Sequence, residues 1–143
     1  MRLARHVPCF PLAISLHAPN DALRGRIVPV SRKIGLAPVM RAADHYFQAS
    51  GRRLTFEYVL LADINDQPEQ AHELVELLRG RTAWVNLIPY NPVDGLSYRT
   101  PRHAAVAQFR RILEMGGLNV RQRQRRGDRI QAACGQLRQR QKP

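Results

Sequence analysis

Cys134 is the residue of this chain whose side chain is best suited to nucleophilic chemistry. It stands in the segment RGDRIQAACGQL, residues 126–137, where an Ala-Ala-Cys-Gly turn interrupts an arginine-rich stretch. The reactive form of a cysteine is the thiolate, and neighbouring guanidinium groups stabilise it by raising the local positive potential. Arg125, Arg126 and Arg129 are close enough in sequence to act in this way. Spacing alone favours a buried structural thiol, so both roles stay open for Cys134 at this point.

The second cysteine, Cys9, limits what thiols can do in this chain. Two cysteines provide neither a disulfide framework nor the ligand spacing of a zinc site. The three thiolates that an iron–sulfur cluster needs are likewise not supplied by the chain alone. Three histidines, His45, His72 and His103, stand in helix-like segments without metal-ligand spacing. We therefore expect no metal site among these residues and a reducing, cytoplasmic setting.

The elements that would position reactive groups are predicted to alternate along the chain. Apolar runs over residues 11–18, 54–61 and 82–90 predict buried strands, and residues 118–124 predict a final edge strand. Amphipathic helices are expected over residues 37–50, 68–80 and 101–117, with Asn20 as a further helix cap. This alternation is typical of βαβ units, so the predicted fold class is α/β with a parallel sheet. The outer edge of the first strand then lacks a neighbour, which proteins normally supply.

Each long helix is expected to bury one face. The inward residues that helical spacing predicts are Val39, Met40, Ala43 and Phe47, then Leu74, Leu77 and Leu78, and finally Ala105, Phe109, Ile112 and Leu113.

Polar side chains follow the predicted strands, at the edge where ligands bind in αβ folds. The alternatives are ordinary: a histidine at a strand end is commonly a satisfied hydrogen-bonding residue, and Asn-Pro is a turn signal. The candidates after the first, second and third strands are Ser15 and His17, Asn65 and Asp66, and Asn86 and Asn91.

The charge of the chain points to a polyanionic partner. Its formal net charge is +12, and 21 of its 23 basic residues are arginine, which binds phosphate with two parallel hydrogen bonds. Ten basic residues against two acidic ones fall between positions 110 and 143. This favours nucleic acid, although arginines spread over a solvated surface are the alternative. The N-terminal apolar run is interrupted by prolines and a histidine, so we expect neither a signal peptide nor a membrane span.

Four segments together resemble a known family. LAISLHAPND (12–21), TFEYVLL (55–61), VNLIPYNPVDG (85–95) and RGDRIQAACGQL (126–137) resemble, in order and spacing, the radical S-adenosylmethionine adenine methyltransferases of the RlmN/Cfr type. The family methylates 23S rRNA, and in some members tRNA, at carbon 2 of adenine, or at carbon 8 in the Cfr branch. The resemblance runs from about residue 11 to residue 138.

The resemblance implies a fold and a set of site residues. It implies a partial (β/α) barrel, roughly the last three βα units of a radical S-adenosylmethionine core. Ser15, Leu16 and His17 match a segment that contacts S-adenosylmethionine, and Asn91 matches another contact to it. Cys134 matches the methyl-carrying cysteine. In the family, its thiolate takes a methyl group, which a radical generated at a [4Fe-4S] cluster then activates for addition to adenine.

The sequence also departs from the family pattern. The CxxxCxxC cluster motif, a Gly-Glu-Pro segment, a partner cysteine and an N-terminal RNA-binding region do not occur in this chain and belong before residue 11. Arg129 and Gln131 stand where the family pattern has acidic residues. We therefore expect the C-terminal half of such an enzyme, with residues 1–125 forming half of the barrel and residues 126–143 a carrier-cysteine segment and basic tail.

Two functional interpretations follow from these departures. In the first, the chain is the C-terminal fragment of a truncated or split 23S rRNA (adenine-C2) methyltransferase, and in the split case an N-terminal half on another chain supplies the cluster. The 143-residue chain alone is then expected to bind no [4Fe-4S] cluster and to transfer no methyl group. In the second, the chain is a catalytically inactive remnant that binds RNA through its arginines.

Overall fold

The computed structural model describes residues 10–123, whose helices and strands alternate as the sequence predicts. The first predicted strand is shorter than expected, because the chain turns away from the sheet after Ser15. A short helix and a 3-10 turn, η2, follow this strand where the sequence suggested only a cap. The elements are β1 (Ala13–Ser15), α1 (Asp21–Ile27), η2 (Pro29–Arg32), α2 (Leu36–Ser50), β2 (Leu54–Leu60), α3 (Pro68–Leu78), β3 (Ala83–Pro89), α4 (His103–Met115) and β4 (Asn119–Gln122).

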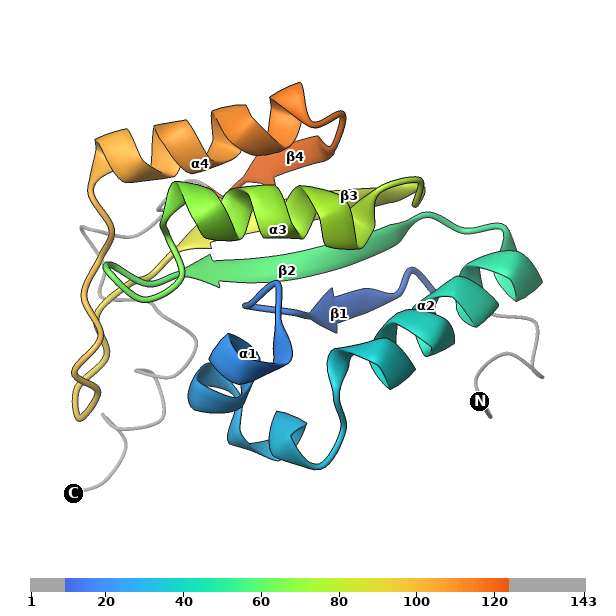
Figure 1. The fold of residues 1–143 in the computed structure, drawn as a ribbon, viewed down its shortest axis with the longest axis horizontal. Helices are drawn as coiled ribbons and strands as arrows, with labels where there is room; N and C mark the ends of the chain where they lie inside the picture. The colour runs from blue at the N-terminus through green and yellow to red at the C-terminus, as the bar shows by residue number, and fades with distance from the viewer. Residues whose placement is uncertain (1–9, 124–143) are drawn as a thin grey trace, which may run out of the picture.

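The four strands form one parallel sheet in the order β1-β2-β3-β4 (Figure 1). Within the described residues, β1 and β4 are its two edges, as predicted for the first and last strands. The pairing of Glu57 with Ser15 on one side and with Asn86 on the other sets the register. All four carboxyl ends therefore lie along one edge of the sheet, which we call the carboxyl edge.

Local sequence explains where the helices begin and end. Asn20 caps α1 by accepting a hydrogen bond from the amide of Leu23 at 2.9 Å, which confirms its predicted role. Pro68 opens α3, and the side chains of Gln67 and Gln70 form a capping box around it. The helix α2 ends at Ser50, and Gly51 follows it with a φ of 64°, in the left-handed region that glycine adopts without strain.

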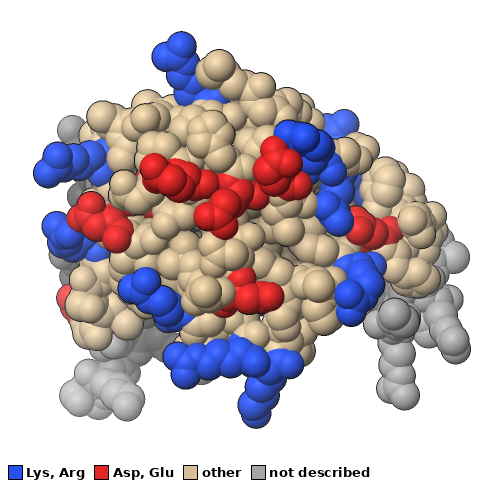
Figure 2. All heavy atoms as spheres, in the orientation of Figure 1, with Lys and Arg blue, Asp and Glu red and all other residues tan. Residues whose placement is uncertain are grey.

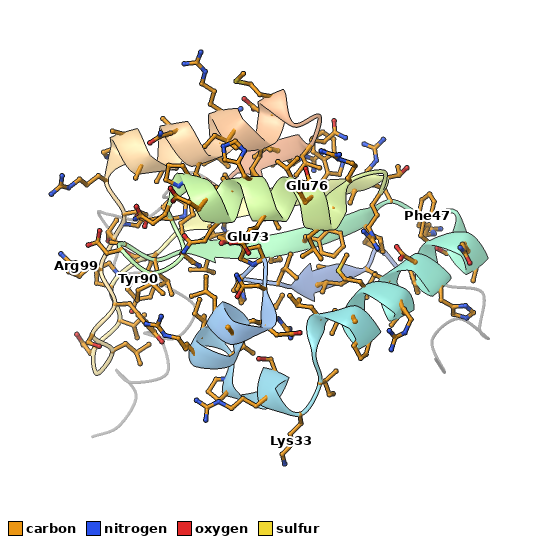
Figure 3. All side chains as sticks on the ribbon, viewed as in Figure 1. Lys33, Phe47, Glu73, Glu76, Tyr90 and Arg99 are labelled. Atoms are coloured by element: carbon orange, nitrogen blue, oxygen red, sulfur yellow. The ribbon has the colours of Figure 1, made fainter. Side chains whose placement is uncertain are left out.

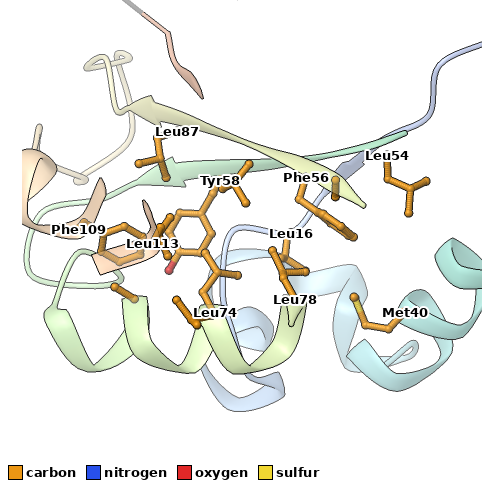
Figure 4. Close-up of a cluster of buried hydrophobic side chains, with 14 of the residues drawn as sticks. Leu16, Met40, Leu54, Phe56, Tyr58, Leu74, Leu78, Leu87, Phe109 and Leu113 are labelled. Carbon is orange, nitrogen blue, oxygen red and sulfur yellow. The ribbon is translucent and has the colours of Figure 1, made fainter. Parts of the chain in front are cut away.

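The hydrophobic core lies between one face of the sheet and helices α2, α3 and α4 (Figure 4). Alternate residues of β2, namely Leu54, Phe56, Tyr58 and Leu60, are buried, and the residues between them are half-buried. The ring of Phe109 on α4 packs against that of Tyr58, with 5.2 Å between their centroids. The sheet thus buries the centre of one face against helices, whereas Ile14 and Val120 on the two edge strands are half-buried.

The predicted inward faces are right in part. Met40, Ala43, Leu74, Leu78, Phe109 and Leu113 are buried as expected. Five other residues are only half-buried, because each helix turns a neighbouring residue toward the core instead. They are Val39, Phe47, Leu77, Ala105 and Ile112. The residues that take those inward places are Leu36 and Tyr46, Ala71 and Val75, and Val106.

None of the helices in residues 10–123 is long and apolar enough to cross a membrane.

Candidate functional site at the carboxyl edge of the sheet

The segment Ser15–His17 lies where β1 ends and the chain leaves the sheet. Ser15 is exposed, whereas the side chain of Leu16 is fully buried in the core, so Leu16 presents only its backbone to this edge. The amides of Leu16 and His17 both donate to the carbonyl oxygen of Glu57, at 2.9 and 3.4 Å. His17 itself has φ 60°, a left-handed conformation that is uncommon for a residue with a side chain. Such a conformation persists only where the surrounding contacts hold it.

The imidazole of His17 is held in one orientation. Its Nδ1 accepts a hydrogen bond from the backbone amide of Val59 at 3.1 Å. Burial, and then the positive charge of Arg24, lower the pKa of His17 below its usual value of 6.5. A neutral imidazole that accepts at Nδ1 carries its proton on Nε2. Within residues 10–123, this Nε2–H has no hydrogen-bond partner.

Arg24 braces the same segment from α1. The side chain is buried, with 7% of its surface exposed, and its partners are backbone oxygens. Nε donates to the carbonyl oxygen of Leu16, and Nη2 donates to that of Ser15, both at 3.1 Å. The sequence did not single out Arg24, because an arginine in a short polar helix looks like any other surface arginine. Its role depends on contacts with residues eight and nine positions earlier.

The loop after β3 brings Asn91 to the same edge. Tyr90 is buried, and its carbonyl accepts a hydrogen bond from the Thr100 hydroxyl at 3.0 Å. The amide of Ala62, just after β2, donates to the carbonyl of Arg99, also at 3.0 Å. These two bonds anchor both ends of the loop formed by residues 91–98. Asn91 is exposed at the start of this loop. Figure 3 labels Tyr90 and Arg99 at this end of the molecule.

A charged depression of about 290 Å³ lies between the loops that follow β2 and β3. Two carboxylates, Asp63 and Asp66, and two guanidinium groups, Arg99 and Arg102, contribute to its lining. Arg99 pairs with Asp63, and both side chains are largely exposed. Asp66 is nearly buried and accepts hydrogen bonds from the amide of Asp63 and the side chain of Gln67. The depression therefore offers both anionic and cationic contacts.

The structure brings one further predicted residue to the His17 segment and leaves the others away from it or outside the described residues. Asn65, in the loop after β2, is fully buried and donates to the carbonyl of His17, whereas Asn86 of β3 donates to the Glu57 side chain at 2.9 Å. Cys9 and Cys134 lie outside the described residues, as does the whole segment 126–143. Within residues 10–123, no group of three or more His, Cys, Asp or Glu side chains could hold a metal ion.

Acidic and basic side chains occupy different parts of the surface (Figure 2). Acidic side chains gather across the middle of the face shown, where Figure 3 labels Glu73 and Glu76 on α3. Basic side chains lie around the periphery, where Figure 3 labels Lys33 and Arg99. The acidic middle of this face would repel a polyanion, whereas its basic periphery would not.

Comparison with curated proteins confirms the resemblance expected from the sequence. The chain is 66% identical over 129 residues to a protein of Rhodopirellula baltica named "Probable dual-specificity RNA methyltransferase RlmN", which covers 90% of this chain and 35% of that protein. It is 47% identical over 137 residues to "Dual-specificity RNA methyltransferase RlmN" of Pseudomonas entomophila, covering 94% of this chain and 36% of that protein. The chain thus spans little more than a third of these relatives. No protein-family model matches the sequence.

Comparison with solved structures confirms the predicted fold class. A radical SAM methyltransferase from Sphaerobacter thermophilus superimposes with a TM-score of 0.89 and 44% identity, covering 94% of this chain and 40% of that chain. A domain of pyruvate-formate lyase-activating enzyme from Bacteroides vulgatus gives a TM-score of 0.66 at 19% identity, which is a likeness of fold alone. The four parallel strands and their helices are therefore a partial version of the radical SAM methyltransferase fold.

Proposed function

We propose that this chain, a homologue of RlmN-type RNA methyltransferases over nine tenths of its length, forms one wall of the S-adenosylmethionine site of such an enzyme and supplies its methyl-carrying cysteine. The observation that carries the proposal is the 66% identity over 129 residues with the Rhodopirellula baltica protein. The reaction would be methylation of adenine in RNA, with 23S rRNA and tRNA as substrates. Such substrates would place the protein in the cytoplasm.

The residues at the carboxyl edge fit the polar groups of S-adenosylmethionine. The exposed Ser15 hydroxyl, the Nε2–H of His17 and the exposed amide of Asn91 can bind the carboxylate, amino and hydroxyl groups of this molecule. Leu16 would contribute through its backbone, because its side chain is buried in the core. When bound, S-adenosylmethionine supplies a methyl group on a positively charged sulfur, which makes that methyl open to attack by a thiolate.

Cys134 would receive this methyl group. Its thiolate sulfur would form a bond to the methyl carbon while the bond from that carbon to the sulfonium sulfur breaks. The electron pair of the broken bond stays on the departing sulfur, and the products are S-methylcysteine and S-adenosylhomocysteine. Arg125, Arg126 and Arg129 would favour the thiolate before the transfer.

The [4Fe-4S] cluster of the family would be held elsewhere. The described residues contain no group of side chains that could ligate a metal, and the whole chain has two cysteines. The cluster therefore does not fit this part of the enzyme. We assign it to the part of the relatives that this chain does not span, on the same polypeptide or on a partner chain.

RNA would approach the carboxyl edge. Arg99 and Arg102 are exposed beside the charged depression and can bind phosphate oxygens. The outward side of α3 carries Glu69, Glu73 and Glu76, which would repel RNA from the helical face. The basic segment after residue 123 would add phosphate contacts in both interpretations of the sequence.

The experiment that tests this function restores the missing part. The 143-residue chain is mixed with the portion of the Rhodopirellula baltica relative that it does not match. The mixture is reconstituted with iron and sulfide without oxygen and given S-adenosylmethionine and a 23S rRNA fragment. We expect methylated adenine only when both polypeptides are present.

The matched control is the same relative divided at the same position. If its two portions methylate RNA together while this chain fails to replace one of them, the proposal is wrong. RNA binding without methylation in that case would favour the inactive remnant.

A further inference from the structure

Asn65 uses both of its side-chain N–H donors and its side-chain oxygen at the point where β1 and β2 separate. It is fully buried. Its Nδ2 donates to the carbonyl of Val59 at 2.7 Å and to that of His17 at 2.9 Å, and its Oδ1 accepts from the amide of Leu61 at 2.7 Å. An amide side chain with both N–H groups and its oxygen bonded is fixed in one orientation.

These bonds replace a piece of missing strand. Along β2, the backbones of Thr55 and Glu57 bond with the β1 side through Leu12, Leu16 and His17. Val59 is the next position facing β1, but the chain turns away at His17 and offers no backbone partner. The amide of Val59 instead donates to Nδ1 of His17, and its carbonyl accepts from Nδ2 of Asn65. Two side chains therefore satisfy the backbone groups that a longer β1 would have satisfied.

A buried tyrosine holds the Asn65 backbone in turn. The Tyr58 hydroxyl donates to the carbonyl of Asn65 at 2.9 Å. Burial first, and then the negative charges of Glu73 and Asp66, raise the pKa of Tyr58, so the hydroxyl keeps the proton that it donates. Asn65 is thus supported from the core, and its bond to the His17 carbonyl crosses to a segment 48 positions earlier in the chain.

We infer that Asn65 is a positioning residue that holds His17 in its left-handed conformation, with Nδ1 bonded to the Val59 amide and the ring proton on Nε2. The inference rests on the proposed function only for its purpose, since His17 would contact S-adenosylmethionine. Asn65 itself would touch no substrate, because its three side-chain hydrogen bonds are all made within the protein.

The test follows the His17 imidazole in the full chain by ¹⁵N nuclear magnetic resonance. The native protein should show one tautomer, protonated at Nε2 and unprotonated at Nδ1. Asn65→Ala leaves the carbonyls of His17 and Val59 without their donor. We expect this variant to show a mixture of tautomers, while resonances of the Phe109 ring report that the core is intact.

Asn86→Ala is the matched control, because it removes the same side chain from the next strand, where Asn86 bonds Glu57. It should leave the tautomer of His17 unchanged. A folded Asn65→Ala variant whose His17 spectrum equals that of the native protein would overturn the inference.

A measurement on the native chain covers the case in which Asn65→Ala does not fold. The two side-chain amide protons of Asn65 and the amide proton of Val59 should exchange slowly with solvent, and exchange at the rate of free amides would also overturn the inference. Because these readouts concern only His17 and the residues bonded around it, they succeed or fail independently of methyl transfer.

Discussion

Nδ1 of His17 accepts a hydrogen bond from the backbone amide of Val59, 3.1 Å away. The bond ties the loop after β1 to the end of β2 and, in a neutral imidazole, places the ring proton on the opposite nitrogen, Nε2. A protonated imidazole would carry a hydrogen on Nδ1 and could not accept this bond. The geometry of the site therefore depends on a neutral His17.

The first prediction concerns pH. Because the folded state lowers the pKa of His17 below 6.5, the unfolded chain takes up a proton first as the pH falls. The free energy of unfolding should therefore decrease as the pH drops from 6.5 through the folded-state pKa, and this contribution should be fully present above 6.5. Denaturant titrations at a series of pH values measure the effect.

His17→Asn provides the comparison for this prediction. Asparagine adopts the left-handed region readily and its oxygen can accept from Val59, but it does not titrate. The variant should show a weaker pH dependence in this range. If the free energy of unfolding depended on pH equally in the variant and in the native protein, His17 would not be the cause of the pH dependence.

The second prediction concerns the contact between α3 and the end of α4. A Cβ at Gly116 would lie 2.5 and 2.6 Å from the two methyl carbons of Val75, which is nearly buried. Gly116→Ala should therefore lower the free energy of unfolding by about 1–3 kcal/mol through overpacking. Thermal and denaturant unfolding measure this change.

Two variants show whether the clash with Val75 is the cause. Gly25→Ala, where the nearest atom is 3.6 Å from the new Cβ, should be neutral or slightly stabilising in its helix. Combining Gly116→Ala with Val75→Ala should cost less than the sum of the single changes. If the losses of the two single variants simply added in the double variant, the clash with Val75 would not be the cause of the destabilisation.

The order of elements could be predicted from the sequence, whereas the contacts around His17 could not. Apolar runs and helical spacing identified the strands and the long helices, because burial against one layer imposes a period. Asn20 was recognisable because capping is a local interaction. Asn65 and Arg24 act through hydrogen bonds to the His17 segment that depend on where the sheet brings distant residues together. No period or spacing in the sequence encodes such contacts.

Hydrophobic spacing also did not identify every helix residue that faces the core. Tyr46 rather than Phe47 is buried on α2, and the Tyr46 hydroxyl donates to the carbonyl of Phe10 at 2.6 Å. Hydrophobicity alone ranks phenylalanine first, but the tyrosine finds a backbone partner for its polar end. On α4, Val106 takes the inward place expected for Ala105 because the larger side chain buries more apolar surface.

The third prediction concerns Arg24. Arg24→Met removes the donors to the carbonyls of Ser15 and Leu16 and should lower the free energy of unfolding by about 1–3 kcal/mol. It should also raise the pKa of His17 part of the way toward 6.5, because burial, the larger cause of its lowered pKa, remains. Chemical denaturation and imidazole resonances measure the two effects.

Arg24→Lys separates charge from geometry. It keeps the positive charge beside His17 but cannot reach both carbonyls as the guanidinium does. The pKa of His17 should then stay low while stability falls. An unchanged His17 pKa in Arg24→Met would contradict this assignment.

The fourth prediction concerns RNA. Arg99→Ala and Arg102→Ala should each weaken binding of single-stranded RNA and reduce the slope of log affinity against log salt by about 0.7. Fluorescence anisotropy at several salt concentrations measures both quantities. Arg79→Ala is the control, because Arg79 is exposed at the far end of α3 and paired with Glu76. An equal loss in Arg79→Ala would mean that RNA binds without preference for the carboxyl edge.

Methylation of Cys134 tests the central claim most directly. The chain is assembled with the complementary portion of the Rhodopirellula baltica relative and incubated with S-adenosylmethionine that carries an isotopically labelled methyl group. Mass spectrometry of the digested chain should find the labelled methyl on the Cys134 sulfur, and Cys134→Ala should abolish labelling of RNA. Labelled RNA from the Cys134→Ala variant, or from a native chain whose Cys134 never carries the label, would contradict the account.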